Sequence, residues 1–211
     1  MIMSALREAS RVRGAEAPGE AIESGSEAGV EERILDAALV CLARFGVAKT
    51  TLDDVAREAG CARATVYRYF ASKAALLGAA ADGERERISA AVDAAGASAD
   101  TLGDALSAML LTAARELSAQ EALQRVLEVE PEAILLHLAF EGCDRTLAFA
   151  SLRFAPTLTR FLPSDKAARA AEWSTRVLFA YLHPSGAPIS MTDEDSVRDL
   201  VRRLVLPAFV S

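Results

Sequence analysis

The chain has 211 residues, which is enough for a hydrophobic core without disulfides or a structural metal. Hydrophobic residues make up 52% of it and charged residues 25%, as in an ordinary globular protein. The formal net charge of -7 argues against a protein that coats nucleic acid or anionic lipid with its whole surface, so any contact with DNA must be local.

The cysteines and the apolar segments of the sequence indicate in which cellular compartment the protein resides. Cys41, Cys61 and Cys143 lie far apart and form no CxxC pair, which favours a reducing cytoplasm. No N-terminal apolar run resembles a signal peptide, and no stretch of about 18 apolar residues is available to span a bilayer. We therefore expect a cytoplasmic protein that does not enter a membrane.

Residues 1–29 are rich in Gly, Ala, Ser and Glu, and their glycines interrupt any helical periodicity. Such a segment buries too little apolar surface to order itself, so we predict a disordered tail. Its arginines, Arg7, Arg11 and Arg13, are within reach of DNA phosphates only if the tail lies near DNA. A solvated tail is the simpler interpretation.

The first predicted helix begins at Glu31. Apolar residues recur from there at intervals of three and four positions as far as Phe45, and Gly46 follows as a stop signal. A second helix, of about two turns, begins near residues 50–51, where two threonine hydroxyls suit an N-cap, and it ends before Gly60.

A third short helix is predicted over residues 63–70, and Ser72 caps a longer helix that begins at Lys73. Gly60 lies in the turn between the second and third helices, where a positive φ is easiest without a Cβ. Ala56 faces the partner helix, where a larger side chain would push the pair apart. The other inner positions of the pair are apolar or largely so: Leu52, Val55, Ala59, Cys61, Val66 and Tyr69.

The rest of the chain also has helical periodicity, without the alternation of strands. Helices are predicted over residues 101–117, 120–128, 132–140, 145–161, 165–183 and 194–207. Pro156 falls inside one of these patterns and is expected to kink or split that helix, and residues 183–192 are the clearest loop. The predicted fold class is all-α.

The segment from Arg44 to Lys73 is positively charged in an otherwise acidic chain. It contains six basic residues and three acidic ones, a net charge of +3. A stretch of this size is, by itself, more often a solvated face than a binding site. The motif within it decides between the two.

Residues 31–80 resemble the N-terminal motif of the tetracycline-repressor (TetR) family. The matching elements are Thr50-Thr51, Ala56 with Gly60, Thr65-Val66-Tyr67-Arg68-Tyr69-Phe70 and Ser72-Lys73. Two positions depart from the family pattern, since Ala62 replaces the serine that often caps the third helix and Ala64 replaces a common glycine. The resemblance implies a three-helix helix-turn-helix domain that binds DNA.

In such a domain the third helix presents its N-terminal half to the major groove. Arg63 is expected to donate two hydrogen bonds to guanine, and Thr65 to touch a base edge or a thymine methyl. The remaining candidates are contacts to the sugar-phosphate backbone or nearby, which fix register rather than sequence. They are Lys49, Thr51, Tyr67, Arg68, Tyr69 and Lys73.

A single helix-turn-helix touches few base pairs, so two copies related by a two-fold axis are expected at an inverted-repeat operator. The resemblance implies a homodimer built from the last two helices of each chain. The candidate interface residues are Trp173, Val177, Tyr181, Val197, Leu200, Val201 and Leu204. The alternative is that the same apolar stripes are core within one chain.

The resemblance also implies that the central helices enclose a cavity for a small hydrophobic effector. The candidate lining residues are Met109, Leu110, Phe140, Phe149, His137 and Arg176. Effector binding would separate the two recognition helices and release DNA, as in a repressor. A DNA-binding activator, or a regulator that needs no ligand, is the alternative.

The predicted organisation is a tail at residues 1–29, a helix-turn-helix DNA-binding domain at 30–75, and a helical effector-binding and dimerisation domain at 76–211. An enzyme is not expected, because the chain has no Gly-rich phosphate loop, HExxH, GxSxG or paired metal-ligand spacing. No cofactor or metal is expected either. The two histidines of the chain, His137 and His183, have no local partners in the sequence and are interpreted as structural.

Overall fold

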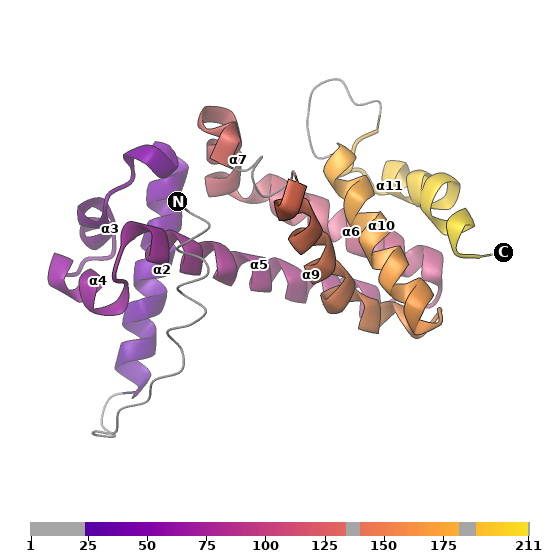
Figure 1. Ribbon diagram of the computed structural model, residues 1–211, viewed down its shortest axis with the longest axis horizontal. Coiled ribbons are helices and arrows are strands. Elements are labelled where there is room, and N and C mark those ends of the chain that lie inside the picture. Colours follow the sequence, from indigo (N-terminus) through magenta and orange to yellow (C-terminus); the bar gives the residue numbers. More distant parts are fainter. Residues whose placement is uncertain (1–23, 134–139, 182–188, 211) are drawn as a thin grey trace. The chain divides into compact units, whose positions relative to one another are not determined.

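A computed structural model of the chain describes the backbone of residues 24–133, 140–181 and 189–210, and their side chains except those of 24–27 and 140–143. Every regular element in these ranges is a helix, which confirms the all-α fold (Figure 1). The elements are α2 (Ser24–Lys49), α3 (Leu52–Glu58), α4 (Arg63–Tyr69), α5 (Lys73–Ala97), α6 (Leu102–Ala119), α7 (Glu121–Val129), α9 (Phe140–Leu158), α10 (Ser164–Tyr181), α11 (Glu194–Leu200), η2 (Val201–Val205) and η3 (Leu206–Ala208).

The helices form two compact units. The first contains Met1–Arg85 and Glu121–Pro131, and the second contains Glu86–Gln120 and Glu132–Ser211. The first half of α5 therefore belongs to the first unit, beyond the boundary expected at residue 75, because Leu76 packs in the core of that unit. Helix α7 also belongs to the first unit, although it follows α6 of the second directly in the chain.

The core of the first unit joins α2, α3, α4 and the start of α5. In Figure 1, α3 and α4 lie beside α2. The buried side chains of this core are Ile34, Ala37, Ala38, Cys41, Leu52, Val55, Ala56, Val66, Phe70, Leu76 and Ala80. Burial raises the pKa of the Cys41 thiol, so this side chain remains neutral and packs as a small apolar group.

Helix α2 begins earlier than its sequence pattern predicts. Its first residue is Ser24, so residues 24–29 are helical although they were assigned to the tail, while residues 1–23 lie outside the described part. The stop expected at Gly46 is a break in the helix, where this residue has φ 77° and ψ -177°. One further turn then leads to Lys49.

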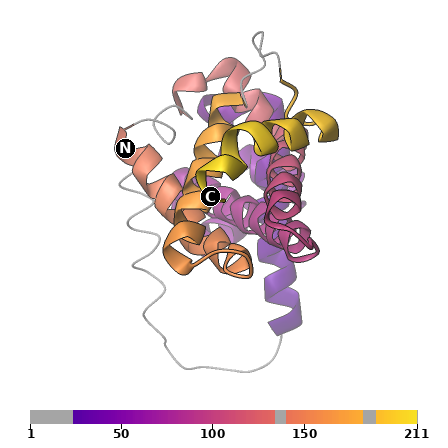
Figure 2. The ribbon, with the colours of Figure 1, turned by 90° about the vertical axis from the view of Figure 1, so that its right-hand side faces the viewer.

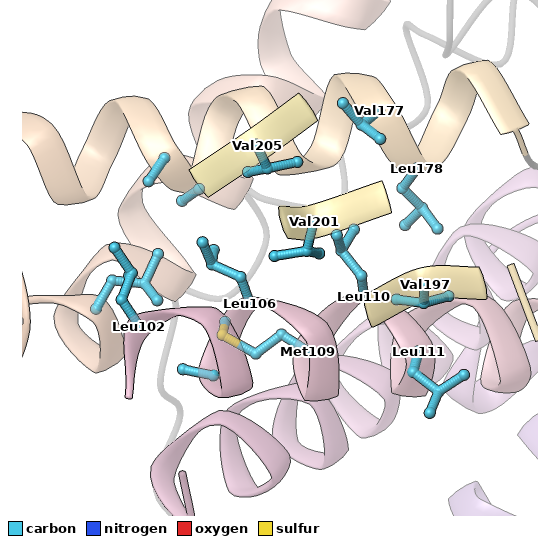
Figure 3. Close-up of a cluster of buried hydrophobic side chains, with 14 of the residues drawn as sticks. Leu102, Leu106, Met109, Leu110, Leu111, Val177, Leu178, Val197, Val201 and Val205 are labelled. Atoms are coloured by element: carbon cyan, nitrogen blue, oxygen red, sulfur yellow. The ribbon is translucent and has the colours of Figure 1, made fainter. Parts of the chain in front are cut away.

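The core of the second unit lies between α6, α10 and the C-terminal elements. Figure 2 shows α11 across α10, and Figure 3 shows Val197, Val201 and Val205 in one buried cluster with Leu106 and Leu110 of α6. Val197, Val201 and Val205 are at most 1% exposed. The apolar stripe of α11 is therefore covered by the chain's own α6.

Two helix ends differ from the sequence prediction. Pro156 does not split α9, because it lies in the last turn of a helix that ends at Leu158 rather than Phe161. After Leu200 the helix widens into the π-turn η2 and then tightens into η3, where Pro207 has no N–H to continue the α-helical pattern. The predicted helix 132–140 and loop 183–192 lie partly outside the described residues.

Among the residues that the structure describes, none of the helices combines the length and the apolar character needed to cross a membrane.

Candidate nucleic-acid interface

Helix α3 begins with a reciprocal hydrogen-bonded cap. The amide of Asp54 donates to the Thr51 hydroxyl oxygen at 3.2 Å, and the amide of Thr51 donates to the Asp54 carboxylate at 3.3 Å. The Thr51 hydroxyl also donates to this carboxylate, which lowers the pKa of Asp54. Asp54 therefore stays charged at the positive end of the helix, and its contribution to stability is lost only as pH falls through the lowered value.

Replacing Thr51 with alanine removes the N-cap and is expected to lower the free energy of unfolding by about 1 kcal/mol. The reason is that the amide of Asp54 loses its acceptor and the Asp54 carboxylate loses one of its donors, the Thr51 hydroxyl. Urea denaturation followed by circular dichroism measures the change. Thr51→Ser retains the hydroxyl and is the control. An equal loss in both variants would contradict the role of the cap.

Helix α4 carries an arginine and a tyrosine on one exposed face. Arg63 is its first residue and Tyr67 lies one turn later, with 44% of its surface exposed. The Arg63 guanidinium lies over the Tyr67 ring, 5.3 Å from its centroid, and donates from Nη2 to the Tyr67 hydroxyl at 3.1 Å. The hydrogen bond to Tyr67, followed by the charge of Asp53, raises the pKa of Arg63, so the guanidinium stays protonated.

The other side chains of α4 divide between solvent and core. Thr65 is half-buried, and Tyr69 is half-buried against the core of the first unit. Arg68 is exposed and lies over the Tyr69 ring at 5.1 Å. Ala62 forms no side-chain cap, as its departure from the family pattern implies. The start of α4 thus exposes Arg63, with its amides free of a capping side chain.

The end of α2 forms hydrogen bonds with two residues that are distant in the sequence, Glu130 and Lys73. Both carboxylate oxygens of Glu130, just after α7, accept from the amide of Ala48 at 3.0 Å. From the start of α5, Lys73 donates Nζ to the carbonyl of Ala48 at 3.0 Å. These contacts fix the junction that carries the exposed Lys49 and Thr51. An ammonium has three donors, so Lys73 keeps two for another acceptor.

The charges of this unit are partly neutralised in pairs. Each acidic residue between Arg44 and Lys73 forms an ion pair with an arginine. These pairs are Arg44–Glu58 at 2.6 Å, Arg57–Asp54 at 3.1 Å and Arg63–Asp53 at 2.9 Å. The net positive charge of the segment therefore comes from its three other basic residues, Lys49, Arg68 and Lys73.

The contacts of three acidic residues of this site were not predicted from the sequence. Asp54 had a local signal, since it stands three positions after Thr51 in the spacing of a capping box. Asp53 meets Arg63 across the turn, and Glu130 meets Ala48 from 82 positions away. No pattern along the chain signals such contacts between helices.

Residues 34–80 match the family model described as bacterial regulatory proteins, tetR family. The chain is a DNA-binding transcriptional regulator of the TetR family. Regulators of this family are transcription factors rather than enzymes, in agreement with the expectation that the chain is not an enzyme. None of the curated proteins compared with this TetR-family regulator matches it.

Solved structures of TetR-family proteins share the fold over most of the chain. One is the repressor AlkX of Dietzia sp. strain DQ12-45-1b, which is implicated in biodegradation of n-alkanes. It is 20% identical to this chain with a TM-score of 0.60, and the aligned part covers 84% of this chain and 95% of AlkX. The fatty acid degradation regulator FadR of Bacillus halodurans is 17% identical with a TM-score of 0.62, covering 85% and 96%. SmeT, the repressor of the Stenotrophomonas maltophilia multidrug efflux pump SmeDEF, is 24% identical with a TM-score of 0.59, covering 86% and 90%.

The residues predicted to line an effector cavity are not gathered at one described site. Met109 and Leu110 are buried in the core of the second unit of this TetR-family regulator. Phe149 is half-buried, with its ring edge-on to that of Phe154 at 6.4 Å. Arg176 is exposed and donates to the Glu172 carboxylate at 3.1 and 2.8 Å. His137 and the Phe140 side chain lie outside the described residues.

The residues predicted to form a dimer interface divide into a set that is buried within the chain and a set that is exposed. Four are buried within the chain, because α6 and its neighbours already cover them: Val177, Val197, Leu200 and Val201. Tyr181 is half-buried against the same core. Trp173 and Leu204 are 44% and 50% exposed, and the indole Nε1 of Trp173 donates to the Leu204 carbonyl at 3.4 Å. Among the predicted interface residues, Trp173 and Leu204 are therefore the two with the most exposed surface.

Proposed function

We propose that this regulator is a cytoplasmic homodimeric repressor that binds an inverted-repeat operator and is released from it by a small hydrophobic effector. The observation that carries the DNA-binding part is the exposed face of α4, where Arg63 begins the helix and Tyr67 follows one turn later. In this proposal the helix-turn-helix at residues 30–75 binds DNA, and residues 76–211 bind the effector and the second chain.

Arg63 is the proposed base reader. It lies at the N-terminal end of α4, the part of a recognition helix that reaches base edges. A guanidinium is planar and donates two parallel hydrogen bonds to O6 and N7 of guanine, which distinguishes a G·C pair from the other three. Thr65, two positions after Arg63 in α4 and half-buried, is the proposed second base contact.

The phosphate contacts are proposed to come from a rim of exposed and half-buried residues on and around α4. Lys49 and Thr51 lie at the junction of α2 and α3, and Lys73 begins α5. Tyr67, Arg68 and Tyr69 complete the rim on α4 itself. Because the net charge of +3 is confined to this segment of an acidic chain, DNA binding is expected to weaken steeply with salt.

The homodimer is proposed to form through the exposed part of α10 and the C-terminal elements, at Trp173 and Leu204. Beside Trp173 lies a shallow open depression of about 290 Å³, whose lining residues are Arg169, Glu172, Trp173, Ala208 and Phe209. Two recognition helices related by a two-fold axis reach two half-sites, which one copy alone does not.

The hydrophobic effector is supported by the apolar character of the second unit and by its structural relatives. Two of these are described as regulators linked to n-alkane biodegradation and fatty acid degradation, and a third as the repressor of a multidrug efflux pump. We propose an apolar effector whose pocket includes residues of the central helices, with Met109, Leu110, Phe140, Phe149, His137 and Arg176 as the candidates.

Selection of bound fragments from the organism's own DNA tests the proposal. The purified full chain should retain duplexes that contain an inverted repeat, with an affinity that falls as salt rises. Adding apolar compounds such as fatty acids should then release the selected duplex. Retention of DNA with no release by any compound would favour a regulator without a ligand. Absence of salt-sensitive binding to every duplex would overturn the proposal.

Arg63→Ala is expected to relax base preference at one position of each half-site, whereas Lys49→Ala weakens binding to all duplexes about equally. Lys49 is preferable to Tyr67 for this comparison, because the Tyr67 hydroxyl accepts a hydrogen bond from Arg63. Fluorescence anisotropy with the selected duplex and single-base-pair variants measures both effects. The slope of log affinity against log salt should become shallower by about one in Lys49→Ala. The same loss of discrimination in both variants would contradict the division.

A further inference from the structure

The proposed base reader is held by a carboxylate from the other helix of the pair. Arg63 Nη1 donates to Asp53 Oδ2 at 2.9 Å, while Nη2 donates to the Tyr67 hydroxyl at 3.1 Å. Asp53 lies in the first turn of α3 and Arg63 begins α4, so the ion pair joins the two helices of the helix-turn-helix. Both side chains remain at least half exposed, at 50% for Asp53 and 59% for Arg63.

We propose that Asp53 is a specificity-determining residue that holds the Arg63 guanidinium in the orientation for reading a base and reduces its attraction to phosphates. This inference rests on the proposed role of Arg63 in base readout. Asp53 itself is a positioning residue, since it acts through Arg63.

The hydrogen bonds of the pair leave the arginine able to bind guanine. A guanidinium has five N–H donors, and Asp53 and Tyr67 each accept one. Three donors remain, and a bidentate contact with O6 and N7 needs two. The ring of Tyr67 below the guanidinium and the carboxylate of Asp53 at its edge together restrict the side chain to a narrow set of orientations.

The same carboxylate works against binding at arbitrary sequences. An arginine without a partner binds any nearby phosphate, and this contact raises the affinity for DNA of every sequence. With Asp53 at 2.9 Å, the local charge is close to zero and the carboxylate repels the DNA backbone. Specificity is the difference between the affinity for the preferred site and the affinity for other sequences, so a lower affinity for other sequences raises specificity.

Stability is a weak alternative explanation for the pair. Exposed ion pairs contribute about 0–1 kcal/mol to folding. The same helix carries a matched pair, Glu58 with Arg44 of α2 at 2.6 Å, which has the same charges and is also exposed. Because Arg44 does not belong to α4, Glu58 provides a control with an equal change of charge on α3.

The experiment compares the full chain with Asp53→Ala, Glu58→Ala and Arg63→Ala. A random duplex library first yields the preferred site of the wild type. Anisotropy titrations then measure affinity for that duplex, for its single-base-pair variants and for a duplex of scrambled sequence, across a range of salt concentrations. Urea denaturation verifies that each variant is folded.

Asp53→Ala is expected to lower discrimination between the preferred and the other base pairs about 5-fold, at the position where Arg63→Ala abolishes it. An effect of about 5-fold is near the low end of the discrimination that one bidentate contact supplies. Binding to the scrambled duplex should tighten, with a salt dependence steeper by about one charge. Glu58→Ala should change that discrimination less than about 2-fold. In the double variant of Asp53 and Arg63, discrimination should equal that of Arg63→Ala alone.

Two outcomes would overturn the inference, and a third would overturn its basis. If Asp53→Ala keeps full discrimination while Arg63→Ala loses it, the carboxylate does not position the reader. If Asp53→Ala and Glu58→Ala lose discrimination equally, the effect is one of general charge. If Arg63→Ala itself keeps full discrimination, Arg63 reads no base, and the proposed readout fails along with the inference.

Discussion

Replacing Gly46 with alanine is expected to destabilise the first unit by about 3 kcal/mol. The backbone at Gly46 has φ 77° and ψ -177°, a region that residues with a Cβ almost never adopt and that costs them about 1–3 kcal/mol. A Cβ there would also lie 2.5 Å from Oε1 of Glu130 and 3.0 Å from Cγ2 of Val129. Strain and overlap therefore act together at this position.

The overlap matters because of what the Glu130 carboxylate does. It accepts the amide of Ala48 with both oxygens at 3.0 Å, just beyond the break in α2. A side chain at Gly46 would push the carboxylate away and leave the Ala48 amide without this partner. The junction that leads to α3 would lose its contact with α7, so DNA affinity should fall together with stability.

Two other glycines serve as controls for Gly46→Ala. Gly60 also has a positive φ, 64°, but a Cβ there meets nothing within 4 Å, so Gly60→Ala should cost about 1 kcal/mol from backbone strain alone. Gly83 lies inside α5 in open space, and Gly83→Ala should stabilise by about 0.5–1 kcal/mol. Similar losses for Gly46→Ala and Gly60→Ala would show that Glu130 is easily displaced.

Hydrogen exchange of the amides in α2, α3 and α4 is the appropriate measurement for these three variants. The single tryptophan, Trp173, lies in the second unit, so its fluorescence does not report on the first. A chain with two compact units also need not unfold in one step, which makes a local measurement safer than one midpoint.

Most of the helix-turn-helix was predictable because its signals are local. Thr51 caps α3, Gly60 has the positive φ expected in the turn, and the Ser72 hydroxyl accepts the amide of Ala75 at the start of α5. Each of these features depends on residues within four positions of one another. Caps and turns of this kind are fixed by short stretches of sequence.

The faces of the C-terminal helices were predictable, but not their partners. The spacing of Val197, Val201 and Val205 marks one buried face of the last helix. It does not distinguish burial against α6 of the same chain from burial against a second chain. Only the packing in the folded chain, where these side chains share a buried cluster with Leu106 and Leu110, separates the two possibilities (Figure 3).

Contacts across long separations were beyond sequence reasoning. The ion pair of Asp53 with Arg63 depends on the angle between α3 and α4, and the contact of Glu130 with Ala48 depends on which helix packs beside α2. Neither depends on a pattern of spacing. Such residues look like ordinary surface carboxylates in the sequence, although both touch the elements that carry the proposed DNA contacts.

Leu204→Glu is expected to raise the dissociation constant of the proposed homodimer about 100-fold or more. Leu204 is 50% exposed, and in a two-fold interface each substitution occurs twice, so two carboxylates would be buried in apolar contacts. The fold of the variant should be retained, because the Leu204 side chain is half exposed and its contact with the Trp173 indole is made by the backbone carbonyl. Analytical ultracentrifugation over a range of concentrations measures the change.

Leu152→Glu is the matched control for this substitution. Leu152 is 81% exposed on α9, away from the C-terminal elements in sequence, and the proposed interface does not include it. The control should remain dimeric and bind the operator like the wild type. Leu204→Glu should lose affinity for the two-half-site operator at low protein concentration, while its weak binding to a single half-site is unchanged, because α4 is untouched. Dissociation by Leu152→Glu but not by Leu204→Glu would place the interface on α9 and contradict the proposed surface.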